Sequence, residues 1–154
     1  MFLGDGITRI PELLQAGVRI GLGTDGGCTN SRLSVFEEMR MTSLLQRVRL
    51  LDGAAFDAAR ALDLGTRSGA EILGLAAGVI APGRLADLVG VDLDDASLHP
   101  RTDLLKSVVY AMSPRAVTDV WVHGRRVVEE RRLTTVDQAA LMARVREVTK
   151  GWTL

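Results

Sequence analysis

The sequence predicts a mixed α/β fold, and three observations carry that prediction. Residues 11–27 have the pattern of a short helix, a glycine, a short strand and a polar loop, which is one unit of an alternating α/β fold. Apolar residues at helical spacing follow, from residue 34 to about residue 74. After Gly78 the chain changes to short β-rich runs and ends in one more helical pattern.

The first α/β unit begins with a helix predicted at residues 11–16. Pro11 suits the first turn of a helix, and Gly17 suits the position just after the last turn. Residues 18–22 (Val-Arg-Ile-Gly-Leu) have the pattern of a short strand. The glycines of residues 23–27 then free the backbone for a sharp turn.

A long helix is predicted to begin at Ser34 and to continue to about residue 50. Glu37 lies three residues after Ser34, which completes the capping-box pattern of a helix start. Two further helical regions are predicted at residues 55–63 and 67–74, separated by a glycine.

The later part of the chain predicts β structure and a final helix. Strands are expected at residues 86–91, 106–110, 117–123 and 125–128. His123-Gly124 is a candidate hairpin turn between the last two. Thr135 with Gln138 predicts the cap of a last helix. Its apolar stripe, which should pack on the strands, is Leu141, Val145, Val148 and Trp152.

The chain therefore divides near residues 76–78, into residues 1–76 and residues 77–154. One parallel strand cannot form a sheet, and parallel sheets are covered by helices on both faces. We expect the first part to be incomplete by itself.

Composition excludes several classes of protein. Hydrophobic residues make up 47% of the chain, which is enough for a packed core. Nineteen basic residues balance nineteen acidic residues, so no basic face is available for nucleic acid. Cys28 is the single cysteine, which excludes an intrachain disulfide and suits a reducing compartment. With no apolar stretch near the roughly 20 residues that span a bilayer, we expect a soluble cytoplasmic protein without membrane partners.

The sharpest chemical feature is Asp25, within Gly21-Leu22-Gly23-Thr24-Asp25-Gly26. A carboxylate on a glycine-rich loop just after a strand is where α/β barrels place catalytic groups. Strand-end aspartates also cap helices and tie down loops, so the pattern alone leaves both roles open.

Several segments in order point to one family. They are PELLQAGVRIGLGTDG (11–26), Cys28-Thr29-Asn30-Ser31, SVFEEMRM (34–41), TRSGAEILGL (66–75), the pattern G-x-I-x-P-G-x-x-A-D-L-V-x-x-D (78–92) and VTDVWVHGRRVVEERRL (117–133). Together they resemble the C-terminal part of the metal-dependent amidohydrolases of the cytosine deaminase, adenosine-derivative deaminase and chlorohydrolase type.

The resemblance implies a fold and a site. Residues 1–76 would be the end of a (β/α)8 TIM barrel, its last strand and helices, and residues 77–154 the C-terminal part of a composite β-sandwich with a helix. Asp25 matches the aspartate that, in the family, binds the catalytic divalent metal (zinc or iron) and takes a proton from the metal-bound water. Asn30 lies where the family has an asparagine that braces the site or approaches substrate.

Departures from the family pattern limit what this chain can do alone. The family's other metal ligands are histidines, including a His-x-His pair. This chain has only His99 and His123, and neither matches a ligand position. A catalytic zinc needs about three protein ligands, so we expect the isolated chain to be inactive and to bind no metal stably. Cys28 lacks a suitably placed histidine and is interpreted as a small loop or buried residue, not a nucleophile. Asp87 is expected to be structural.

The resemblance implies a hydrolase acting on C–N (or C–halogen) bonds of a small heterocyclic or amidine substrate, most often by deamination. Two alternatives stay open. The chain could be a non-catalytic β-rich module that dimerises or binds a partner, or one half of a split enzyme whose other polypeptide supplies the histidines. Because members of the family are often dimers or larger, a homo-oligomer is also open.

Overall fold

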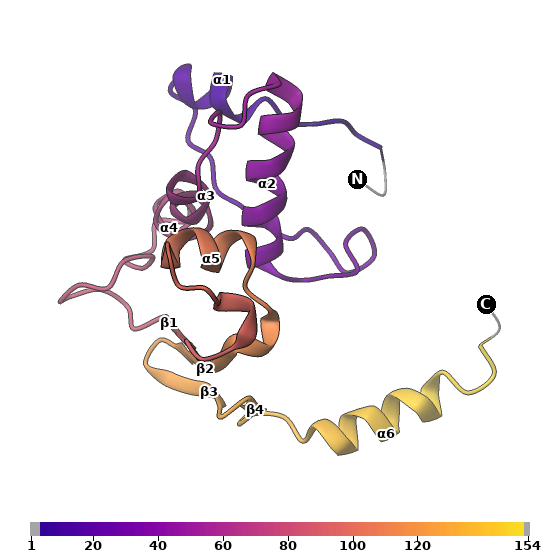
Figure 1. Cartoon of the computed structure of the whole chain (residues 1–154). Helices are drawn as coiled ribbons and strands as arrows, with labels where there is room; N and C mark the ends of the chain where they lie inside the picture. The colour runs from indigo at the N-terminus through magenta and orange to yellow at the C-terminus, as the bar shows by residue number, and fades with distance from the viewer. Residues whose placement is uncertain (1–3, 153–154) are drawn as a thin grey trace.

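The computed structural model describes residues 4–152, and it has the mixed α/β architecture that the sequence predicts (Figure 1). Helices α1 to α5 gather on one side, next to a small sheet. The helices are α1 (Ile10–Gln15), α2 (Val35–Leu50), α3 (Ala58–Gly65), α4 (Arg67–Ile72), α5 (Leu104–Tyr110) and α6 (Gln138–Val148). Short 3-10 helices cover Ala96–Leu98 and Pro114–Ala116. Among these residues, no helix combines the length and the apolar character that crossing a membrane requires.

The predicted ends of α1 and α2 are confirmed. Pro11 occupies the first turn of α1, and Gly17 follows the helix with a φ of 78°, a conformation that favours glycine. At the start of α2 the Ser34 hydroxyl oxygen accepts a hydrogen bond from the Glu37 backbone N–H at 3.4 Å. Local chemistry therefore fixes where both helices begin or end.

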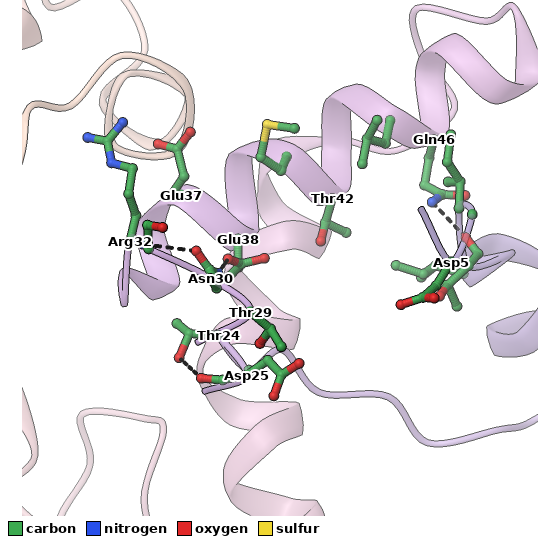
Figure 2. A pocket seen from close by; sticks show the side chains of 18 residues that line it. Asp5, Thr24, Asp25, Thr29, Asn30, Arg32, Glu37, Glu38, Thr42 and Gln46 are labelled. Atoms are coloured by element: carbon green, nitrogen blue, oxygen red, sulfur yellow. Dashed lines mark hydrogen bonds between the residues drawn. The ribbon is translucent and has the colours of Figure 1, made fainter. Parts of the chain in front are cut away.

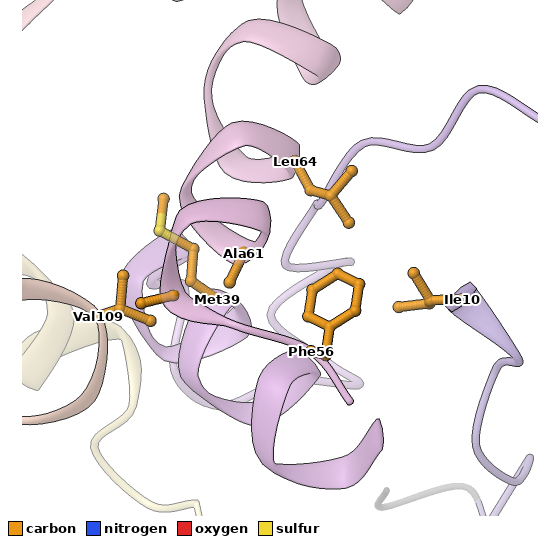
Figure 3. Close-up of a cluster of buried hydrophobic side chains, with 7 residues drawn as sticks. Ile10, Met39, Phe56, Ala61, Leu64 and Val109 are labelled. Atoms are coloured by element: carbon orange, nitrogen blue, oxygen red, sulfur yellow. The ribbon is translucent and has the colours of Figure 1, made fainter. Parts of the chain in front are cut away.

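The hydrophobic core lies between α1, α2, α3 and α5 (Figure 3). Phe56 and Ala61 are fully buried, and Met39 from α2 packs against them. Segment 18–22 approaches α4 so closely that a Cβ on Gly21 would lie 2.9 Å from the Gly69 Cα. Glycine at position 21 therefore permits the close approach of these two segments.

The predicted strand at residues 18–22 is not formed. Its backbone hydrogen bonds to other elements go to helices, from the Val18 N–H to the Leu13 carbonyl at 2.9 Å and from the Leu22 N–H to the Leu64 carbonyl at 3.1 Å. A strand exists only as part of a ladder with a neighbour. All four strands of the described residues lie later in the chain, so this segment has no strand beside it.

The sheet is antiparallel, with strand order β1-β2-β3-β4. Its strands are β1 (Leu88–Val91), β2 (Val117–Val122), β3 (Arg125–Glu129) and β4 (Arg132–Leu133). The predicted hairpin is confirmed, because Val122 pairs with Arg125 around His123-Gly124. Both turn residues have positive φ, 51° and 76°, which suits the right-handed twist of the strands on either side.

Residues 106–110 were predicted as a strand, and that prediction is wrong: they belong to helix α5. The Asp103 carboxylate accepts a hydrogen bond from the Lys106 N–H at 3.0 Å and caps the helix. Val109 is buried in the core formed with α2 and α3. Cap and burial together override the β preference of two adjacent valines. Helices α1 to α4 precede residues 76–78 and all four strands follow them, yet α5 returns from the later part to the helical side.

The prediction that α6 packs on the strands is also wrong. No residue of α6 is buried, and the helix extends away from the rest of the molecule (Figure 1). In its apolar stripe the exposed fraction rises from 43% at Val145 to 76% at Trp152. The cap is Asp137, whose carboxylate accepts from the Ala140 N–H at 3.0 Å, and not Thr135. An aspartate directly before the helix is better placed for that bond.

Candidate functional site

An open pocket of about 550 Å³ lies between the N-terminal segment, the loop after residue 22 and one face of α2 (Figure 2). Asp25 and Asn30 both line it. Glu37, Glu38 and Thr42 reach it from α2. The two site residues predicted from the sequence are thus brought together, in a pocket whose charged groups are mainly carboxylates.

Asp25 occupies a backbone conformation that few side chains tolerate. Its φ is 59°, in the left-handed region, where aspartate is one of the better tolerated non-glycine residues. The Gly26 N–H donates to its Oδ1 at 2.6 Å, and the Thr24 hydroxyl donates to its carbonyl oxygen at 3.2 Å. Thr24 and Gly26 therefore shape the loop and present an exposed carboxylate.

The carboxylate of Asp25 is held in its charged form. The hydrogen bond from the Gly26 N–H, with a smaller contribution from the Thr29 hydroxyl, lowers the pKa of Asp25 below its ordinary value. An anionic, solvent-accessible oxygen pair can accept a proton or bind a hard or borderline cation.

Asn30 connects the loop to α2. Its Nδ2 donates to Glu38 Oε1 at 2.6 Å, and its Oδ1 accepts from the Arg32 N–H at 3.0 Å. Its backbone N–H donates to the Gly26 carbonyl at 2.9 Å. Glu38 was not found from the sequence. The one available signal was an acidic pair at the start of a helix close behind a glycine-rich loop.

The other residues singled out from the sequence lie outside this pocket. Cys28 is exposed on the loop, so the expectation of a loop residue holds and that of a buried one does not. His99 follows the first 3-10 helix, and His123 lies in the β2–β3 turn. The Asp87 carboxylate, directly before β1, accepts from the His123 N–H at 2.5 Å and ties that turn to the start of β1, which is a structural contact.

The residues that the structure describes do not by themselves fit a catalytic metal ion. Within residues 4–152 no group of three or more histidine, cysteine, aspartate or glutamate side chains is arranged to hold one. A hydrolytic zinc takes about three protein ligands and keeps one position open. Asp25 could be one such ligand, and histidines from outside this chain would have to supply the others.

Comparison with known proteins gives one family. A model of the amidohydrolase family matches residues 1–127. A 5-methylthioadenosine/S-adenosylhomocysteine deaminase of Syntrophomonas wolfei is 36% identical over 152 residues, which cover 97% of this chain and 35% of that protein. The enzyme of the same name from Pelotomaculum thermopropionicum is 42% identical over 144 residues, covering 93% and 33%. The chain thus spans about a third of the length of these relatives.

Solved structures give the same picture. An adenosine deaminase from Xanthomonas campestris with bound zinc superposes with a TM-score of 0.89 at 37% identity, over 94% of this chain and 34% of that one. Atrazine chlorohydrolase from Arthrobacter aurescens, complexed with zinc, superposes with a TM-score of 0.86 at 27% identity, over 95% and 33%. Each likeness includes both the helical part and the sheet.

Proposed function

The chain belongs to the amidohydrolase family, and we propose that it forms the C-terminal part of a metal-dependent hydrolase that deaminates a small heterocyclic substrate. The family and the relatives are hydrolases, and the relatives named above are deaminases. The substrate class is taken from them, because it is common to proteins that match more than nine-tenths of this chain.

We assign residues 1–76 to the end of a TIM barrel and residues 77–154 to part of a composite β-sandwich with its helix. The support is that one zinc-bound deaminase matches 94% of this chain at a TM-score of 0.89. In such a barrel, segment 18–22 would be the last strand and would lie between two neighbours. That arrangement accounts for a strand-like sequence whose backbone has no ladder with any of residues 4–152.

The observation that carries the proposal is the setting of Asp25. An ionised carboxylate stands on a loop directly after a strand-like segment, lines a pocket and lies within the family match. This is the place where barrel enzymes carry their chemistry. We propose that Asp25 contributes one carboxylate to a metal site, zinc or iron, completed by histidines from the remaining two-thirds of the protein.

Asn30 has a supporting part in this proposal. Of the two roles that the resemblance implies, the contacts favour bracing over substrate binding, because its amide nitrogen and amide oxygen both have partners within the chain. In the reaction itself, water adds to the ring carbon that bears the amino group, the C–N bond breaks and ammonia leaves.

The test is ammonia release from 5′-methylthioadenosine and adenosine by the longer protein that carries this chain, beside the 154-residue chain alone. We expect turnover by the longer protein and none by the chain. Elemental analysis should find a divalent metal bound to the longer protein and none stably bound to the 154-residue chain. A longer protein that binds no divalent metal and hydrolyses none of a panel of amino- and chloro-heterocycles would refute the proposal.

A second candidate function, self-association, is supported by α6. Its apolar stripe is exposed, although a helix of this pattern ordinarily buries that face. A second copy of the chain, or the rest of the barrel protein, would cover it.

A further inference from the structure

Apart from the Ser34 cap at the start of α2, one side-chain hydrogen bond fastens the described loop after Asp25 to the helix. Asn30 forms that contact, through the 2.6 Å hydrogen bond from its Nδ2 to Glu38 Oε1 (Figure 2). The same residue reaches back toward Asp25, because its backbone N–H donates to the Gly26 carbonyl. Asn30 thus contacts the helix through its side chain and the Gly26 carbonyl, next to Asp25, through its backbone.

Glu38 is a fixed point for this contact. It lies in the first turn of α2, next to Met39, which is 3% exposed in the core. One turn later the fully buried Ser43 donates its hydroxyl to the Phe56 carbonyl at 2.5 Å. The helix is therefore anchored, while the Asp25 loop is exposed. A hydrogen bond to a charged acceptor is also stronger than one between neutral groups.

We propose that Glu38 is a positioning residue for Asp25, acting through Asn30. By holding the Asn30 side chain, Glu38 keeps the turn from Gly26 to Asn30 closed, and this turn sets where the Asp25 carboxylate stands in the pocket. The inference rests on the proposed function, because the position of Asp25 matters to a reaction only if Asp25 belongs to the site.

Glu37 provides the matched control. It is the other glutamate in the first turn of α2, and it also lines the pocket. Its carboxylate faces Arg40 on the same helix, with 3.8 Å between the charged atoms. Replacing Glu37 by alanine removes the same charge from the same helix end and leaves the Asn30 contact in place.

The experiment measures amide hydrogen exchange by NMR in the 154-residue chain, for the wild type and for Glu38→Ala, Glu38→Gln and Glu37→Ala. The reporters are the Thr29 and Asn30 amides, both bonded to the Gly26 carbonyl. Amides of α2 between residues 39 and 46 are the reference for overall stability. Relative to that reference, we expect Glu38→Ala to speed loop exchange about tenfold and Glu37→Ala to stay within about twofold.

Glu38→Gln retains an oxygen that can accept from Asn30, so it should recover most of the protection. The proposal is overturned if Glu38→Ala leaves loop exchange unchanged, if both alanine variants act alike, or if glutamine does not restore protection. If Glu38→Ala also loosens α2, Asn30→Ala serves as a second variant: it should speed Thr29 exchange with α2 intact, and no change there overturns the proposal. The experiment measures the order of the loop and not turnover. The Glu38 proposal can therefore fail while the hydrolase assignment stands, and the hydrolase assignment can fail while the Glu38 proposal stands.

Discussion

The phenolic oxygen of Tyr110 accepts a hydrogen bond from the Arg47 guanidinium at 2.6 Å, and the same guanidinium lies 5.0 Å from the centre of the Tyr110 ring. The tyrosine hydroxyl is also 2.8 Å from the Ser43 hydroxyl. Because Ser43 gives its one proton to the Phe56 carbonyl, Tyr110 is the donor in that pair. These contacts hold α5 against α2.

Removing the Tyr110 hydroxyl should loosen this junction. We expect Tyr110→Phe to lower the free energy of unfolding by about 1–2 kcal/mol, because Arg47 and Ser43 each lose a partner in a half-buried site. Urea denaturation followed by circular dichroism measures the change. Ser107→Ala, on the same helix, is the control and should stay within about 0.5 kcal/mol of the wild type. Equal effects of the two substitutions would contradict the assigned role.

Asp25 should be essential in the longer protein. Replacing it with asparagine removes the charge but keeps the shape, and we expect kcat/KM to fall by about 10²- to 10⁴-fold, the usual worth of a group that moves a proton. Asp94→Asn makes the same chemical change at an exposed position that pairs with Arg101, and should leave turnover near normal. Near-normal turnover of Asp25→Asn would contradict the site assignment.

Asp119 should make stability depend on acid pH. Hydrogen bonds from Thr118 first, then from Arg126 and the Glu130 N–H, lower the pKa of Asp119 below its ordinary value of 3.8. A carboxyl whose pKa is lower when folded stabilises the fold above its unfolded pKa, and that contribution disappears as the pH falls through the folded value. Urea titrations from pH 7 down to about pH 3 should therefore show a shallower acid decline for Asp119→Asn than for the wild type. Parallel declines would contradict this reasoning.

The stripe on α6 should drive association of the isolated chain. We expect light scattering after gel filtration to give a molar mass above the 16.6 kDa of one chain. The double substitution Leu141→Gln with Val145→Gln should return the mass to the monomer value. Arg144→Gln with Glu147→Gln, which removes an ion pair from the same helix, is the control and should leave association unchanged. A wild-type chain that runs as a monomer at all concentrations would contradict self-association.

The elements that could be predicted from the sequence are those fixed by neighbouring residues. Ser34 with its N–H partner three residues on, and the two positive-φ residues of the His123-Gly124 turn, act within a few positions of the chain. Segment 18–22 could not be settled in this way, because a strand depends on a neighbour. The valines of α5 suggested a strand because their burial against α2 and α3 cannot be seen from local pattern.

The same distinction holds for the candidate site. Asp25 was found because a carboxylate in a glycine-rich loop is visible in a few consecutive letters. Glu38 was missed because its contact with Asn30 depends on how the loop between them closes. The amphipathic pattern of α6 predicted a helix correctly, but the expectation that its apolar face packs on the strands was wrong, because such a pattern does not identify the neighbour.

The return of α5 to the helical side bears on how the molecule can be divided. Residues 76–78 lie where helices give way to strands, yet Val109 and Tyr110, from beyond that point, pack into the core with Phe56 and Met39. After a single cut of the backbone at residues 76–78, the two pieces would stay associated, because α5 of one piece packs against α2 and α3 of the other. If the first piece were expressed alone, the part of the core that α5 covers would be exposed; if the second were expressed alone, α5 would lack the helices α2 and α3 on which it packs.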